Sequence, residues 1–454
     1  MTKIGSSHII DSQFFGDDYS TIASRAIFND LNRINRWLEV EKALVRCQIK
    51  MGIIPKNIGE ELLGKGDVGN FDLQRMLNNF KKTKHSLMPV LKEWESCVSK
   101  EAAHYIHYGP TTQDIEDTAQ MLEMRDVLDI AISDLKEINK ILCSLAIANK
   151  MVVTIGRTHG QNALPMTMGL KIATWLDEAN RNYKRLIYCR RNLLVAQLFG
   201  GVGTMAAFKG QGNTLLERFS AELDLKAPKI GWHTTRDRFT EILAIFAIIA
   251  GGLARAANEI IQLNKNEIGE LSEPFTIGQI GSSTMPHKQN PELCEHVVTL
   301  AKLIKGNASL NFDTLQSEHE RDYRAMRMEW VTIVDSSMYL CWILDAMKYI
   351  LSGLIVKTKN IERNVKSASG EIASEALMFH IGKSIGKNQA HHAVYDAAVA
   401  AKENNTTLID EIKKVYTGDW DDLAKTINPN LHLGETKDII ESVVDDAKLT
   451  LEQF

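Results

Sequence analysis

The sequence predicts a nearly all-α protein, and three observations support this fold class. Only nine of the 454 residues are proline, and none occurs between Pro165 and Pro228 or between Pro291 and Pro429. Because proline interrupts helices, these gaps leave room for long ones. Within the gaps, apolar residues recur every three or four positions, which is the spacing of one helix face. The alternation that is typical of strands is scarce.

The chain divides into three predicted helical domains. An N-terminal domain is expected over residues 1–110, a central bundle over 111–357 and a C-terminal domain over 358–454. The last region contains TGDWDDLAK and Pro429, which indicate shorter helices and loops.

Five helices, several of them much longer than the average of about 11 residues, are expected in the central bundle. They are predicted over 114–150, 168–194, 236–268, 293–310 and 329–354. The first half of 236–268 is apolar on nearly every side, which indicates a helix buried all round. Such a helix needs neighbours that one chain does not readily supply, so we expect an oligomer.

Composition excludes several classes of protein. The net charge is −4 and the mean hydropathy is −0.17, so we expect no general attraction to nucleic acid or to an anionic membrane. The longest strongly apolar run, 242–254, ends at Arg255 and is shorter than the ~18 residues of a membrane span. No secretion signal is visible, and the six cysteines show no CxxC spacing. We therefore expect reduced thiols in a cytoplasmic protein.

Three polar loops interrupt the apolar scaffold, and HYGPTTQD (107–114) is the first. Thr111, Thr112 and Asp114 are good N-cap residues for the helix that follows. The same hydroxyl and N–H groups at a helix N-terminus can bind carboxylate or phosphate. A capped helix start and an anion site are both consistent with this loop.

The second loop is GRTHGQNALP (156–165), a break between long helices. Arg157 and His159 stand there beside two glycines. An imidazole can exchange a proton near neutral pH, and its charged form stabilises carboxylates. A structural role for His159 is an equal alternative at this stage.

The third loop, GQIGSSTMPHKQNPE (278–292), is the most informative. It combines a candidate base or nucleophile (Ser282), a cation (Lys288) and an amide (Asn290). A carbanion next to a carboxylate is stabilised by an ammonium and by hydrogen-bond donors. A serine acts as a base only if its alkoxide is stabilised, which Lys288 and the backbone N–H groups of the loop can provide.

A further cluster, SEHERDYRAMRMEW (317–330), carries Arg321, Arg324 and Arg327 at three-residue spacing. Such a series is either a solvated helix face paired with the nearby acidic residues or a clamp for carboxylate or phosphate, which guanidinium binds in a bidentate manner.

Together these loops resemble the fumarase/aspartase superfamily over roughly residues 20–400. GSSTMPHKQNP resembles the superfamily signature, and HYGPTTQD and GRTHGQNALPMTMG resemble its first and second conserved regions. The resemblance implies three helical domains with a central five-helix bundle. It also implies a homotetramer with a twenty-helix core and active sites built from three subunits. The implied substrate is a small molecule that contains a dicarboxylate, and no cofactor or metal is implied.

The resemblance also implies roles for individual residues. Ser282 matches the general base, and His159 matches the general acid that protonates the leaving nitrogen in adenylosuccinate lyases. The positions that match substrate-binding residues are Lys288, Asn290, Thr111, Thr112, His85, Arg321, Thr158 and Gln161.

Two branches of the superfamily compete. His85 and the RTHG form resemble adenylosuccinate lyases, which release fumarate from a succinyl-nitrogen compound, and this is the favoured function. WHTTRDR, the EHER…EW pattern and SEALMFHIGKSIGKNQAHHAVYDAA resemble 3-carboxy-cis,cis-muconate cycloisomerases. Gln289 replaces the usual arginine of the signature, and the Arg-Tyr pair of the nucleotide enzymes is missing, which argues against nucleotide binding. A cycloisomerase or a related lyase is therefore the alternative.

Overall fold

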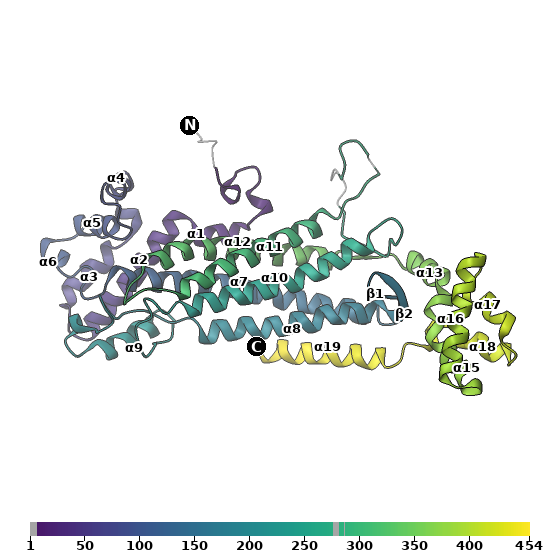
Figure 1. Ribbon diagram of the computed structural model, residues 1–454. Helices are drawn as coiled ribbons and strands as arrows, with labels where there is room; N and C mark the ends of the chain where they lie inside the picture. The colour runs from purple at the N-terminus through teal and green to yellow at the C-terminus, as the bar shows by residue number, and fades with distance from the viewer. Residues whose placement is uncertain (1–6, 276–280, 286) are drawn as a thin grey trace. The chain divides into compact units, whose positions relative to one another are not determined.

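The computed structural model describes residues 7–275, 281–285 and 287–454, and helices dominate them (Figure 1). Gly278 and Pro286 of the third loop lie outside the described residues. Outside the five long helices, the helices are α1 (Ile22–Phe28), α2 (Asp30–Lys50), α3 (Lys56–Lys65), α4 (Leu73–Thr83), α5 (Met88–Ser96), α6 (Lys100–Ala103), α9 (Gly212–Glu222), α13 (Thr358–Ser367), α14 (Ser369–Ile372), α15 (Ser374–Ile385), α16 (Lys387–Asn404), α17 (Leu408–Val415), α18 (Trp420–Thr426) and α19 (Thr436–Gln453).

The five long helices are confirmed close to their predicted bounds. They are α7 (Thr112–Ala148), α8 (Met168–Asn192), α10 (Asp237–Leu263), α11 (Glu292–Asn311) and α12 (Tyr323–Ser352). The described strands form two antiparallel pairs, β1 (Val153–Thr158) with β2 (Gln161–Thr167) and β3 (Leu271–Ser272) with β4 (Ile355–Val356).

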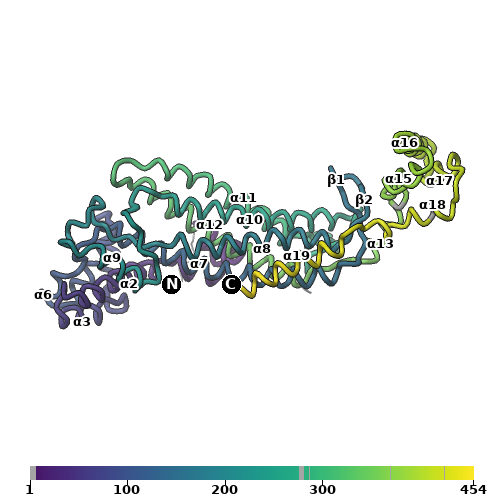
Figure 2. Tube along the Cα trace, turned by 90° about the horizontal axis from the view of Figure 1, so that it is seen from below, coloured from purple at the N-terminus to yellow at the C-terminus, as the bar shows by residue number. Residues whose placement is uncertain are grey.

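The described residues form two compact units, to each of which all five long helices contribute. The first unit consists of residues within Met1–Leu135, Asn182–Gly251 and Thr299–Asp345, and the second of residues within Lys136–Arg181, Gly252–Val298 and Ala346–Phe454. In the first unit, α9 lies beside α2 (Figure 2). In the second, α15 to α18 gather around an apolar cluster that includes Leu377, Ile381 and Ile412 (Figures 1 and 2). The predicted division into three domains stays a prediction.

Within a single chain, helix α10 is buried along most of its length and leaves one apolar position exposed. Phe246 and Ile249 are fully buried, whereas Ile248 between them is 46% exposed. Among the described helices, α10 has the length and apolar character of a membrane span, and 56% of its most apolar window is buried inside the protein. Burial of this kind is equally typical of a core helix.

A buried ion triad joins α7, α12 and the chain just ahead of α10 within the first unit. The Arg236 guanidinium donates to both carboxylate oxygens of Asp117, at 2.8 and 2.9 Å, and its Nε donates to Glu329 at 2.9 Å. All three side chains are completely buried. The guanidinium also lies over the ring of Trp232, 5.0 Å from its centroid. The charges therefore depend on one another for the solvation that water would otherwise provide.

We predict that Arg236→Met lowers the free energy of unfolding by about 3–5 kcal/mol, because it leaves two buried carboxylates without their cation. Urea denaturation followed by circular dichroism measures the loss. Arg255→Met is the matched control, since Arg255 pairs with Glu178 at 2.6 Å while half of its side chain is exposed. Its loss should be below about 1 kcal/mol. Equal losses for the two variants would contradict the structural importance of the triad.

Candidate active site

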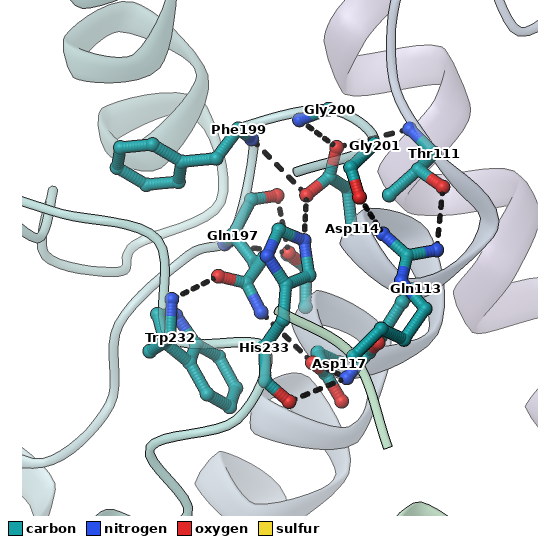
Figure 3. A network of polar contacts seen from close by, with 12 residues as sticks. Thr111, Gln113, Asp114, Asp117, Gln197, Phe199, Gly200, Gly201, Trp232 and His233 are labelled. Carbon is teal, nitrogen blue, oxygen red and sulfur yellow. Dashed lines mark hydrogen bonds and ion pairs between the residues drawn. The ribbon is translucent and has the colours of Figure 1, made fainter. Parts of the chain in front are cut away.

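Asp114 holds the loop that precedes α7. Its buried carboxylate accepts hydrogen bonds from the backbone N–H groups of Thr111 at 3.0 Å, Phe199 at 3.1 Å and Gly200 at 2.8 Å. The imidazole of His233 lies 2.9 Å away through Nε2 (Figure 3). These partners replace the water that a buried carboxylate loses. The Thr111 loop is thus fixed against a glycine-rich segment 86 residues further along the chain.

Arg321 reaches the same loop from the chain just ahead of α12. Its Nη1 donates to Thr111 Oγ1 at 2.9 Å, and its Nη2 donates to the carbonyl oxygen of Gly201 at 2.8 Å. Within the described part of the chain, no carboxylate pairs with this exposed guanidinium. Its positive charge therefore remains available to an anion at the N-terminus of α7, beside Thr111 and Thr112.

The other two arginines of the cluster are already engaged. Arg324 forms ion pairs with Glu318 at 2.9 Å and Asp322 at 2.7 Å, as expected for a solvated face. Arg327 lies over the ring of Trp330, 4.9 Å from its centroid. Of the three, Arg321 is thus the candidate for binding a substrate carboxylate.

The segment FGGVG (199–203) was not among the predicted site residues. Gly200 and Gly203 have positive φ angles of 75° and 86°, which glycine adopts without strain. Through Asp114 and Arg321 this segment lies directly beside Thr111. The cluster of three glycines was the available signal, because glycines often mark a close approach of the backbone to a ligand.

His159 lies at the tip of a β-hairpin, where the sequence predicted only a break between helices. Thr158 pairs with Gln161, and His159 and Gly160 form the two-residue turn with φ angles of 53° and 78°. Positive φ at both positions is typical of the tight turn that matches the twist of a hairpin. The side chains of Thr158, His159 and Gln161 are all exposed, so the hairpin presents them together to solvent.

Ser282 belongs to the third loop, named the Gly/Ser loop, of which the structure describes residues 281–285 and 287–292. Two backbone donors contact its hydroxyl oxygen. It accepts hydrogen bonds from the backbone N–H groups of Met285 at 3.1 Å and Thr284 at 3.4 Å. Donors aimed at a hydroxyl oxygen stabilise the negative charge of its alkoxide. Two backbone N–H groups of the loop thus contact the Ser282 hydroxyl, and its role as a base stays a prediction.

Asn290 closes the Gly/Ser loop, and Lys288 extends from it. Asn290 Nδ2 donates to the carbonyl oxygen of Gly281 at 2.8 Å, next to Ser282. Lys288 and Asn290 line a cavity of about 560 Å³ with Ile261 of α10 and with Asn264, which directly follows that helix. The Lys288 ammonium makes no hydrogen bond or ion pair with the described residues, Ser282 included, so its predicted help to the alkoxide is not seen in this conformation.

His85 caps α5 in the first unit. Its Nδ1 accepts a hydrogen bond from the backbone N–H of Met88 at 3.2 Å. A ring nitrogen that accepts carries no proton, so in the neutral imidazole the proton resides on Nε2. This leaves the Nε2–H as a donor for a ligand.

The ten candidate residues fall into three groups by contact and by unit. Thr111, Thr112, His85 and Arg321 belong to the first unit, and Arg321 bonds directly to Thr111. The hairpin tip and the Gly/Ser loop belong to the second unit. Across the residues that the structure describes, no hydrogen bond joins Ser282 to His159, and no three His, Cys, Asp or Glu side chains are grouped to hold a metal ion.

Glu116 lies one helical turn after Thr112 and is an unusual carboxyl. It is 3% exposed, and neither of its oxygens has a hydrogen-bond partner among the described residues. Burial raises its pKa from 4.5 to about 7, and the neighbouring Ser86 hydroxyl and Arg327 guanidinium offset this only in part. Glu116 therefore exchanges a proton near neutral pH, one helical turn from Thr112.

Comparison with known proteins finds the same relationships over most of the chain. A sequence-family model described as "Lyase" matches residues 20–306, and one described as "Adenylosuccinate lyase C-terminus" matches residues 370–443. N-acetyl-S-(2-succino)cysteine lyase of Enterococcus italicus is 36% identical over 406 residues, 89% of each chain. Adenylosuccinate lyase of Archaeoglobus fulgidus is 34% identical over 432 residues, 94% of this chain and 96% of the relative. The crystal structure of 3-carboxy-cis,cis-muconate lactonizing enzyme from Pseudomonas putida superposes with a TM-score of 0.90 at 28% identity, covering 97% of this chain and all of the other.

We predict that Glu116→Gln stabilises the protein increasingly as the pH rises from 5 to about 7. The folded-state pKa lies above the unfolded value of 4.5, so the native protein loses stability as the pH rises from about 4.5 to about 7 and changes little above that. The difference between the two pKa values corresponds to about 3 kcal/mol at most. Urea denaturation at several pH values measures it, with Glu137→Gln, an exposed carboxylate of α7, as the control. A constant difference between variant and wild type at every pH would contradict this assignment.

Proposed function

The chain belongs to the fumarase/aspartase superfamily of lyases, and from this premise we propose that it releases fumarate from a 2-succinyl thioether of the N-acetyl-S-(2-succino)cysteine type. The observation that carries the proposal is the Ser282 hydroxyl oxygen, which two backbone N–H groups of the Gly/Ser loop approach at 3.1 and 3.4 Å. A hydroxyl held in this way is suited to remove a proton from carbon. The choice of a thioether rests on relatives with 36% and 37% identity that carry this name.

In the proposed reaction Ser282, with its own proton released to solvent, takes a proton from the succinyl carbon next to one carboxylate. Lys288 and the guanidinium of Arg321 neutralise the substrate carboxylates as charge develops, and the amide of Asn290 donates a hydrogen bond to them. The electron pair then forms the double bond of fumarate while the carbon–sulfur bond breaks. The sulfur leaves as a thiolate and takes up a proton from His159.

The distribution of the candidate residues supports a site shared between chains. Ser282 and His159 lie on separate loops of the second unit, and Thr111 and Arg321 lie in the first. The exposed apolar residue Ile248 on α10 is suited to contact another copy. We therefore extend the proposal to a homotetramer in which loops from different chains complete each active site.

Adenylosuccinate is the second candidate substrate, and its cleavage would serve purine nucleotide biosynthesis. His85, the RTHG motif and the C-terminal family match support it. Gln289 and the missing Arg-Tyr pair argue against a nucleotide, which is why the thioether is preferred. The cycloisomerase reaction on 3-carboxymuconate has support from the superposition at a TM-score of 0.90, and it forms the third arm of the assay.

We predict that the purified protein releases fumarate from N-acetyl-S-(2-succino)cysteine with a higher kcat/KM than from adenylosuccinate, and that it does not lactonise 3-carboxymuconate. Absorbance of fumarate and of the nucleotide product follows the first two reactions. A higher kcat/KM for adenylosuccinate would show that the nucleotide, and not the thioether, is the preferred substrate. No turnover of any of the three would refute the proposed function.

We predict that Ser282→Ala lowers kcat by about 10³-fold or more, since a positioned base contributes about 10²–10⁴-fold. Ser283→Ala is the matched control, because it removes an exposed hydroxyl from the next residue of the same loop. It should retain activity within about threefold on the proposal that Ser282 is the base. The reverse pattern would move the base to Ser283.

We predict that His159→Asn reduces turnover of adenylosuccinate by about 10²-fold or more, but turnover of the thioether by about tenfold at most. A thiol has a pKa near 8.5 and leaves readily as a thiolate, whereas a nitrogen leaving group needs a proton. Asparagine tolerates the positive φ of this turn, so the backbone is preserved. Equal losses on both substrates would contradict the acid role.

A further inference from the structure

A single buried carboxylate, that of Glu270, binds two separate segments of the second unit, β1 and α13. Glu270 Oε1 accepts hydrogen bonds from Arg157 Nη2 at 2.7 Å and Asn364 Nδ2 at 2.9 Å. Its Oε2 accepts from Arg157 Nη1 at 3.2 Å and Thr154 Oγ1 at 3.1 Å. The Glu270 side chain is completely buried, and although burial alone would raise its pKa, these donors lower it. The carboxylate is therefore ionised and held by four hydrogen bonds.

The backbone of Glu270 is fixed as well. Its N–H donates to the carbonyl of Leu263 at the end of α10, at 2.8 Å, and its own carbonyl accepts from Lys357 at 2.9 Å. An anchor that is itself immobile can hold a second element in one orientation. The second element here is the hairpin of β1 and β2.

The outer part of this hairpin has few other attachments. The strand register shifts between Ile155 and Arg157, so the tip is separated from the inner ladder by an irregularity. From Arg157 to Asn162, in the described structure, Arg157 is the residue whose side chain bonds to the rest of the chain. Arg157 stands two residues before His159. The direction in which the tip extends therefore depends on the two hydrogen bonds from the Arg157 guanidinium to the Glu270 carboxylate, which together form a fork.

We propose that Glu270 is a positioning residue for catalysis: through its two-point contact with Arg157 it fixes the hairpin tip and aims the imidazole of His159 at the leaving group. This inference rests on the proposed function, in which His159 supplies the proton. A displacement of about 1 Å of a catalytic group reduces turnover by as much as about 10²-fold. A carboxylate that never touches substrate therefore acts on kcat.

The first test needs no substrate. In Glu270→Gln, hydrogen–deuterium exchange in peptides covering 153–167 should rise at least about tenfold, because the fork becomes a weaker neutral contact. Glu259→Gln removes a carboxylate paired with Lys171 at 2.7 Å in the same unit and should leave these peptides unchanged. Unchanged exchange in Glu270→Gln would overturn the inference, whatever reaction the protein catalyses.

The second test is a double-mutant cycle. Glu270→Gln should lower kcat by no more than His159→Asn does, with KM within about twofold, and should add no loss in the His159→Asn background. A purely structural role would lower activity by the same factor in both backgrounds, and that result would overturn the inference. If Glu270→Gln does not fold, Arg157→Lys replaces it, because lysine keeps the charge but not the fork. It should show intermediate exchange and intermediate kcat, and wild-type values for both would count against the proposal.

Discussion

Two buried carboxylates, Asp114 and Glu270, are surrounded by hydrogen-bond donors, and these contacts organise both units. In the first unit Asp114 draws in the backbone of Thr111 and Gly200 together with the imidazole of His233. In the second unit Glu270 draws in the hairpin and α13. Each carboxylate joins segments far apart in the sequence, and each holds a loop that carries candidate catalytic or binding residues. Stability and function thus depend on the same contacts.

The helical framework was predictable because apolar spacing reports helix faces directly. The observed bounds of α7 and α8 lie within two residues of the predicted ones. The predicted helix 329–354 begins six residues earlier in the structure, at Tyr323, because the arginine cluster continues the same helix. The β-hairpin was missed because its alternation is short, is interrupted at Gly156 and ends in exposed polar residues. A single His-Gly pair was the available indication of its turn.

The loops of the candidate site were predictable from local motifs, but their contacts were not. Nothing in the sequence indicates that Arg321 bonds to Thr111, 210 residues away, or that Glu270 binds Arg157. Such pairs arise only when the helices bring their ends together. The burial of Glu116 without a hydrogen-bond partner among the described residues was equally unpredictable, because an acidic residue on a helix usually faces solvent.

The turn that carries His159 also limits how this position can evolve. Its left-handed backbone is adopted readily by glycine, asparagine, aspartate and histidine, and poorly by branched side chains. Among these four residues, only aspartate and histidine can exchange a proton, and only histidine does so near neutral pH. On the proposal that His159 is the acid, a descendant enzyme that needs a different acid must therefore rebuild the hairpin or recruit the acid from another loop.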